Sequence, residues 1–297
     1  MTSFSLIFPG QGSQSLGMLS DLSEKFPVVK KIFSEASEVL HYDLWNLTQH
    51  DAEKLDRTEF TQPALLAADI AVYECWKLSN KNTPQFLAGH SLGEYAALVC
   101  AEAFTFQDAI SLVSYRGKFM QNAVKQGAGA MAAIVGLDDD VVVKICNEAS
   151  TIGIVSPANY NSIGQIVIAG ETAAVDNAIE LAKNAGAKIA KKIPVSVPSH
   201  CALMQSAAEK MAEKLKNINI KTPTLKVIQN ADVKIFNSPD EIRNALAKQL
   251  ISPVRWVETI QFMIEKNCKL FLECGPGKVL SGLNKRISRE ITTENLS

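Results

Sequence analysis

The stretch Gly89–Gly93, which reads Gly-His-Ser-Leu-Gly, constrains the fold of this chain more than any other. It matches Gly-x-Ser-x-Gly, the nucleophile elbow, in which a strand turns sharply into a helix and exposes the serine hydroxyl at the bend. The flanking sequence suits that context, because residues 85–88 can end a buried strand and residues 92–101 are good helix formers. The pattern therefore predicts an α/β layer with Ser91 as nucleophile. A serine helix cap with two packing glycines is the alternative.

Amino-acid composition limits the classes of protein to consider. The chain has 297 residues, 47% of them hydrophobic and 21% charged, so it can bury the core of one large domain or two modest ones. The 30 Lys and Arg residues against 31 Asp and Glu argue against a nucleic-acid partner. The six cysteines form no Cys-x-x-Cys pair, which argues against structural zinc and suits a reducing compartment. No signal peptide or membrane span is apparent, so we expect a cytoplasmic protein without a membrane partner.

The N-terminal part is predicted to alternate strand and helix. Phe4–Phe8 reads as a short apolar strand and leads into Pro9–Gln14, a loop rich in glycine and amide side chains. The loop lacks the Gly-Lys-Ser/Thr ending of a phosphate-binding loop, so it either brings a backbone N–H near the active site or is a plain turn. Helices are expected near residues 17–26, 27–40 and 63–78, and residues 42–61 are expected to be irregular.

A positive charge on an apolar helix face is the second informative feature. Residues 106–126 are predicted to form a helix with an apolar stripe at spacings of three and four, and Arg116 falls inside that stripe. A buried guanidinium needs an anion, because an unpaired buried charge is strongly unfavourable. The pattern alone favours a carboxylate of the chain itself. A substrate carboxylate, held by two parallel hydrogen bonds, is the functional alternative.

Residues 129–194 have a different character. They read as strand, helix, strand, strand, helix and strand, the split βαβ order of a ferredoxin-like module. The segments on either side supply strands and helices of a larger α/β layer, so this module is interpreted as an insert. We therefore expect an α/β fold with two subdomains. Residues 1–127 and 196–297 form a larger α/β-hydrolase-like subdomain with a parallel sheet, and residues 128–195 form the small ferredoxin-like subdomain.

Histidine is the residue type best suited to activate a serine, and the chain has four. His41 and His50 lie in polar stretches that we expect to be exposed. His90 is too close in sequence to Ser91 to reach its hydroxyl easily. His200 follows two prolines that hold the chain extended, at the predicted start of a helix. His200 is therefore the best candidate for the general base, and a structural histidine is the alternative.

The last third of the chain adds one more candidate. A predicted helix over residues 240–250 places Gln249 on an apolar face. An amide there needs partners, so Gln249 is either a site residue or a satisfied core glutamine. Strands are predicted over residues 225–229 and 269–273 and a final helix over 279–289, and the tail after that helix is expected to fray.

Several short motifs occur together in order, and as a set they are highly specific. With them the chain, from Phe4 to about residue 287, closely resembles the malonyl-CoA:acyl carrier protein transacylases of bacterial type II fatty-acid synthesis. The motifs are Gly10–Gln14, Gly89–Glu94, Tyr115–Gly117, Asn159–Ser162, Pro198–His200, Gln249–Leu250 with Pro253–Val254, and Glu273–Gly277.

The resemblance implies a reaction and its partners. Malonyl would pass from malonyl-CoA to the phosphopantetheine thiol of acyl carrier protein by a ping-pong route. The coenzyme A thioester is a substrate, and no cofactor and no metal are implied. We expect a monomer. Ser91 would be the nucleophile and His200 its base, in a dyad without an obligatory acid.

The resemblance also assigns the residues around the dyad. The backbone N–H groups of Gln11 and Leu92 would form the oxyanion hole. Arg116 would pair with the malonyl carboxylate, and Asn159 would contact the substrate. Gln249 would orient the histidine through its backbone carbonyl.

Two other functions share parts of this pattern. A serine esterase or thioesterase of the α/β-hydrolase type uses the same elbow, but its residues follow the order serine, acid, histidine. A non-catalytic docking subunit would keep the shape without the chemistry.

The carrier protein of the family is acidic, so the resemblance implies a basic surface near the cleft. Solvated faces are the alternative for such clusters. The candidates, called the basic set below, are Lys188, Lys191, Lys192, Lys285, Arg286 and Arg289.

Overall fold

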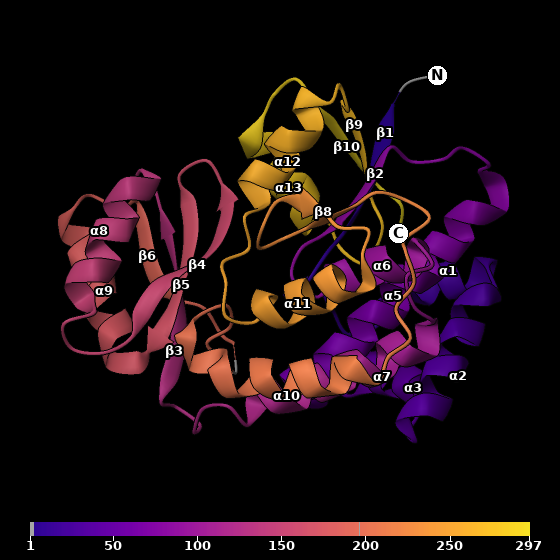
Figure 1. Cartoon of the computed structure of the whole chain (residues 1–297), viewed down its shortest axis with the longest axis horizontal. Helices are drawn as coiled ribbons and strands as arrows, with labels where there is room; N and C mark the ends of the chain where they lie inside the picture. Colours follow the sequence, from indigo (N-terminus) through magenta and orange to yellow (C-terminus); the bar gives the residue numbers. More distant parts are fainter. Residues whose placement is uncertain (1–2, 196) are drawn as a thin grey trace.

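The protein has a mixed α/β architecture built on two sheets (Figure 1). The structure is a computed structural model and describes residues 3–195 and 197–297. In this part of the chain one sheet is mainly parallel and the other antiparallel. The predicted boundary at Ser196 lies outside the described residues.

The larger sheet has the strand order β10-β9-β1-β2-β7-β8 within the described chain. Neighbouring strands run parallel except β8, which is antiparallel to β7. Parallel neighbours need long crossover connections, so helices separate most of these strands in sequence. The strands are β1 (Phe4–Phe8), β2 (Phe86–Gly89), β7 (Val227–Gln229), β8 (Lys234–Ile235), β9 (Leu270–Glu273) and β10 (Thr292–Asn295).

Helices cover both faces of the larger sheet (Figure 1). One face packs against α12 (Trp256–Glu265) and α13 (Val279–Ile287). The other packs against a helical layer. Its members are α1 (Ser20–Lys25), α2 (Val28–Leu40), α3 (Leu44–His50), α4 (Ala52–Leu55), α5 (Thr58–Ser79), α6 (Gly93–Cys100), α7 (Phe106–Gln121), the 3₁₀ turn Ala202–Met204, α10 (Gln205–Lys216) and α11 (Pro239–Gln249).

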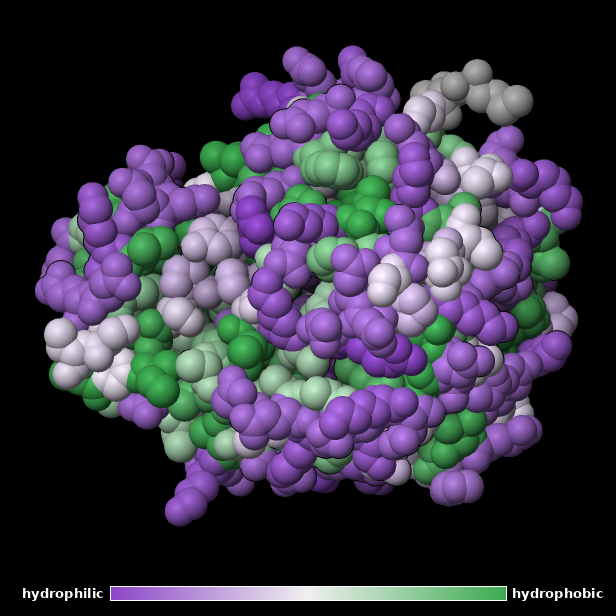
Figure 2. Space-filling model, in the orientation of Figure 1, coloured by the Kyte–Doolittle hydropathy of each residue, from purple (hydrophilic) through white to green (hydrophobic). Residues whose placement is uncertain are grey.

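The alternation of side chains along β1 explains why both faces are buried. Leu6 and Phe8 belong to the core under the helical layer, whereas Ile7 belongs to the core under α12 and α13. Successive side chains of a strand point to opposite faces, so a continuous apolar run suits a sheet covered on both sides. The outward side of α10, by contrast, is hydrophilic (Figure 2).

The antiparallel sheet has the order β4-β5-β3-β6 within the described residues and stands to one side of the larger one (Figure 1). One face forms its own core with α8 and α9. The opposite face, which includes Met131 and Ala169, packs against Cys201. The predicted order of elements is confirmed, with bounds β3 (Gly129–Val135), α8 (Asp139–Ala149), β4 (Val155–Ser162), β5 (Gln165–Glu171), α9 (Thr172–Asn184) and β6 (Ile189–Lys192).

Two predictions of irregular structure were wrong. Residues 42–61 hold α3, α4 and the start of α5. The Asp43 side chain accepts a hydrogen bond from the Asn46 N–H, and Asp51 accepts one from the Lys54 N–H. These caps satisfy N–H groups that a short helix leaves free. The tail does not fray either, because β10 adds to the edge of the sheet as a parallel neighbour of β9.

Other boundaries differ from the prediction. The helix that carries Arg116 ends at Gln121, five residues early. No helix starts at Ser199 or His200. The chain makes a turn there, with His200 at a positive φ of 63°, and α10 begins only at Gln205. Among the helices of the described residues, none combines the length and the hydropathy that crossing a bilayer requires.

Candidate active site

All the predicted site residues except Gln249 line one pocket between the two sheets, and Gln249 lies behind the lining, hydrogen-bonded to Arg116, Ser91 and His200. Its volume is about 90 Å³, and a cavity needs only about 10–15 Å³ of such space to hold one water molecule. The pocket therefore suits a small acyl group rather than a long chain. It is lined by Gln11, Gln62, His90, Ser91, Leu92, Arg116, Met120, Met131, Asn159, Ile193, Val195, Ser199 and His200.

Ser91 lies at the predicted elbow, between the end of β2 and the start of α6. Its φ of 52° is in the left-handed region, which non-glycine residues rarely adopt. The flanking glycines make this turn possible. A Cβ on Gly89 would collide with the backbone of Gly93, and a Cβ on Gly93 would collide with the carbonyl of Phe8. The glycines thus let α6 pack closely against β1, and Ser91 lies just beyond the carboxyl end of β2.

The His200 ring lies within hydrogen-bond distance of the Ser91 hydroxyl. Its Nε2 lies 2.7 Å from Ser91 Oγ. Its Nδ1 lies 2.8 Å from the carbonyl oxygen of Gln249 and 3.2 Å from that of Ser252. Carbonyl oxygens only accept, so Nδ1 carries the proton and Nε2 is left to accept one. Burial, and then the charge of Arg116, lower the pKa of His200 to about 3, so the ring is neutral at pH 7.

Arg116 is buried at the back of the same pocket, with 1% of its surface exposed. Its Nη2 donates to Ser91 Oγ at 3.1 Å and to Gln249 Oε1 at 2.9 Å. Its guanidinium carbon lies 5.7 Å from the centre of the Tyr95 ring, a cation–π distance. In the described part of the chain Nε has no hydrogen-bond partner.

The carboxylate partner that the helix pattern favoured for Arg116 is not found among the described residues. Glu94 acts on the guanidinium through its charge, without a hydrogen bond to it. Burial raises the pKa of Glu94 itself to about 7. The pocket is therefore lined by a buried cation whose Nε donor has no partner in the described part of the chain.

Two of the residues that line the pocket have backbone N–H groups without a hydrogen-bond partner in the described structure. Those of Gln11 and Leu92 have no hydrogen-bond acceptor within the described residues, and both residues line the cavity. The Ser91 N–H is not open, because it donates to Asn230 Oδ1 at 2.6 Å. Asn159 is also in the lining, on β4, where it forms a bridge with Val254.

The other histidines behave as expected. His41 and His50 are exposed. His90 lies beside Ser91 but turns away from its hydroxyl, with Nε2 2.8 Å from Asn161 Oδ1. No group of three His, Cys, Asp or Glu side chains in the described residues could hold a metal ion.

Sequence reasoning missed several residues of the site. Gln62 is buried on α5, and its Oε1 has no partner in the described structure. A polar residue at the head of a long apolar helix was a usable signal. Asn230 follows β7 in a loop and carried no comparable signal.

Comparison with known proteins places the chain in a family. Residues 5–293 match the acyl transferase domain family. The chain is 52% identical to the malonyl CoA-acyl carrier protein transacylase of Escherichia coli K12 over 298 aligned residues, covering 100% of this chain and 96% of that protein. The chain belongs to the malonyl CoA-acyl carrier protein transacylase family.

Solved structures of this family have the same fold. The transacylase of Coxiella burnetii superposes with a TM-score of 0.98 at 53% identity, covering 99% of this chain and 94% of that one. A malonyl-transacylase solved with a type II PKS acyl-carrier protein gives a TM-score of 0.97 at 52% identity, covering 99% of this chain and 96% of that one. The predicted family resemblance is therefore confirmed.

Proposed function

We propose that this chain transfers malonyl from malonyl-CoA to the phosphopantetheine thiol of acyl carrier protein, through a malonyl ester on Ser91, and so supplies extender units for fatty-acid synthesis. One observation carries the substrate: a buried guanidinium with an open donor lies within hydrogen-bond distance of the candidate nucleophile. The malonyl group of malonyl-CoA has a thioester at one end and a carboxylate at the other, so Ser91 can react with the first while Arg116 binds the second. Family membership supports the same reaction.

The first half-reaction follows from the dyad. His200 Nε2 takes the Ser91 proton as Oγ attacks the thioester carbonyl, and the C–S bond to coenzyme A then breaks. His200 returns that proton to the departing sulfur, so coenzyme A leaves as the free thiol. The N–H groups of Gln11 and Leu92 are free to stabilise the oxyanion of the tetrahedral intermediate.

The second half-reaction runs the same steps with a different thiol. The carrier-protein thiol gives its proton to His200 and attacks the ester carbonyl, and Ser91 leaves with the proton. A malonyl ester in this pocket would displace water from around Ser91, which favours the thiol over hydrolysis.

The malonyl carboxylate also tunes the base. Arg116 lowers the pKa of His200 in the free enzyme. A carboxylate bound to Arg116 offsets that positive charge, so the pKa of His200 rises when substrate binds. The base thus becomes stronger when malonyl is in place.

An esterase or thioesterase of the α/β-hydrolase type is not favoured. In such enzymes an acid holds the histidine. Here two backbone carbonyls contact His200 Nδ1. The test is incubation with malonyl-CoA, with and without carrier protein, followed by intact-mass spectrometry. Transfer that outruns hydrolysis supports the transacylase. Hydrolysis at the same rate without carrier protein supports the esterase, and the absence of any adduct supports a non-catalytic docking protein.

We also propose a division of the chain into two subdomains. Residues 1–127 and 196–297 form the α/β-hydrolase-like catalytic part, and residues 128–195 form the ferredoxin-like insert. The strand order β4-β5-β3-β6 and the separate core with α8 and α9 support this division. The cytoplasmic location and the monomeric state stay predictions of the sequence.

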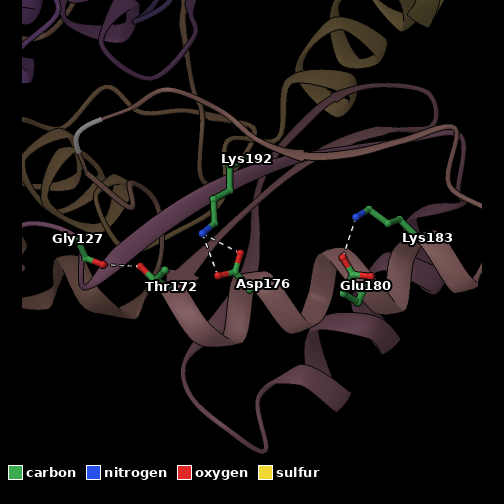
Figure 3. Close-up of polar contacts among 6 residues, drawn as sticks. All are labelled: Gly127, Thr172, Asp176, Glu180, Lys183 and Lys192. Carbon is green, nitrogen blue, oxygen red and sulfur yellow. Dashed lines mark hydrogen bonds and ion pairs between the residues drawn. The ribbon is translucent and has the colours of Figure 1, made fainter.

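Carrier-protein docking on the basic set also stays a proposal, and part of the set has local partners. Lys192 forms an ion pair with Asp176 at 2.8 Å (Figure 3). Arg286 donates to Gln165 Oε1 at 2.7 Å. The charge of Lys192 is offset by this ion pair, whereas the Gln165 amide is neutral and leaves the charge of Arg286 available to an acidic partner.

A further inference from the structure

Ser91 is held by its backbone as well as by its side chain. Both polar groups of its backbone are bound by side chains from distant parts of the sequence. The N–H donates to Asn230 Oδ1 at 2.6 Å, and the carbonyl accepts from Gln249 Nε2 at 3.0 Å. The elbow needs such support, because its φ of 52° is unfavourable for serine and persists only where surrounding contacts determine it.

Asn230 is itself fixed on every side. It is 1% exposed and lies in the loop after β7. Its Nδ2 donates to the carbonyl of Gly89. The Asn230 side-chain amide therefore links the Gly89 carbonyl to the Ser91 N–H. Its N–H donates to Glu94 Oε2 at 2.7 Å, and its carbonyl accepts from the Arg255 N–H at 3.3 Å. A buried side chain with all its groups bonded has one orientation.

This arrangement has a chemical consequence. The Ser91 N–H is occupied by Asn230, so the first open N–H after β2 is that of Leu92. Without Asn230, the Ser91 peptide could rotate toward a more common backbone conformation. Rotation would move Oγ away from His200 Nε2 and turn the Leu92 N–H away from the carbonyl oxygen that it must meet.

We propose that Asn230, held by Glu94, is a positioning residue that locks the peptide of Ser91 into the reactive geometry. The proposal rests on the proposed acyl transfer, since it concerns the rate at which Ser91 is acylated. Asn230 touches neither substrate nor reacting atoms, so it acts through Ser91 and Leu92.

The test compares Asn230→Ala and Asn230→Asp with a matched control, Asn284→Ala. Asn284 is an equally buried amide that accepts from Trp256 Nε1 at 3.0 Å and lies outside the pocket lining. Single-turnover acylation by malonyl-CoA is followed by intact mass, so that the rate refers only to enzyme that can be acylated. Thermal melting reports the stability of each variant.

We expect Asn230→Ala to lower the acylation rate roughly tenfold to a hundredfold, as small displacements of reacting groups do, with the KM for malonyl-CoA little changed. Asn230→Asp keeps an acceptor for the Ser91 N–H but cannot donate to Gly89 until it is protonated. Its rate relative to wild type should therefore recover as the pH falls. Asn284→Ala should melt earlier and acylate at the wild-type rate.

A purely structural role predicts otherwise. The proposal is overturned if Asn230→Ala acylates at the wild-type rate per active enzyme, or if it loses no more rate than Asn284→Ala. If Asn230→Ala does not fold, Asn230→Asp decides, and a constant rate ratio to wild type across pH overturns the proposal. Failure of the proposed function looks different, because the wild-type protein itself would form no malonyl adduct.

Discussion

Replacing Arg116 with alanine should change which acyl group the enzyme prefers. The guanidinium is 1% exposed, no described carboxylate pairs with it, and its Nε is unpaired, so a malonyl carboxylate would be its anion. Two hydrogen bonds to a charged group contribute about 1.5–3 kcal/mol each, or about 3–6 kcal/mol together. At about 1.4 kcal/mol per factor of ten, their loss corresponds to roughly a hundredfold to ten-thousandfold in rate. Malonyl transfer should fall by that factor.

In Arg116→Ala the rate of acetyl transfer should stay the same or rise. Acetyl makes no carboxylate contact with Arg116, and in this variant bound acetyl no longer leaves a buried cation unpaired. The measurement is the ratio of kcat/KM for malonyl-CoA to kcat/KM for acetyl-CoA in each variant. A change in the reactivity of Ser91 or His200 would affect both substrates equally, so it would not change this ratio. Arg116→Lys should restore only part of the ratio, since an ammonium cannot form the planar bidentate pair.

Arg243→Ala is the matched control. Arg243 lies on α11 and donates to the carbonyls of Leu215 and Ile218, outside the pocket. This variant should leave the malonyl-to-acetyl ratio at the wild-type value. If Arg116→Ala lowers both substrates equally, the guanidinium is structural, and the reasoning from its unpaired donor is refuted.

Five further outcomes test the site. Ser91→Ala should form no acyl-enzyme, and a malonyl adduct in its intact mass would exclude Ser91 as nucleophile. His200→Ala should slow single-turnover acylation by roughly a hundredfold to ten-thousandfold, and an unchanged rate would mean that another base operates. The folded-state pKa of His200 is depressed, so the base stays neutral below its ordinary value of 6.5, and the acidic limb of kcat/KM should lie below pH 6.5. In Arg116→Ala that limb should move upward, and a limb that stays in place would show that the charge of Arg116 does not tune the base. Transfer to carrier protein should weaken with added salt while transfer to free pantetheine changes far less, and equal sensitivity would argue against electrostatic docking on the basic set.

Local signals in the sequence determined much of the fold. The elbow could be predicted because glycines at this spacing allow a strand and the following helix to pass close to each other. The structure places Gly89 and Gly93 at that close contact. The order of elements from 129 to 194 followed from alternating periodicity. The chain before α5 was misjudged because α3 and α4 are short and depend on single aspartate caps rather than on a long apolar stripe.

Elimination among histidines identified His200, and the helix pattern identified Arg116 as buried, but the sequence could not give the partners of either. Helix periodicity reports that a side chain is turned inward and says nothing about what it meets there. A carboxylate of the chain was therefore the reasonable expectation for Arg116, and only the folded chain showed Gln249 and Ser91 in its place.

The sequence by itself predicted which groups we propose to react, because a serine at an elbow and a guanidinium on an apolar face are recognisable from their neighbours in the chain. Only the tertiary structure decided how they are held. The carbonyls that contact His200 belong to the end of α11 and the loop after it. The amide that contacts the Ser91 N–H belongs to the loop after β7. The strand β10 pairs with β9. These contacts join residues far apart in sequence. They form because buried polar groups need hydrogen-bond partners, and the pattern of residues along the chain does not show which distant residues will supply them.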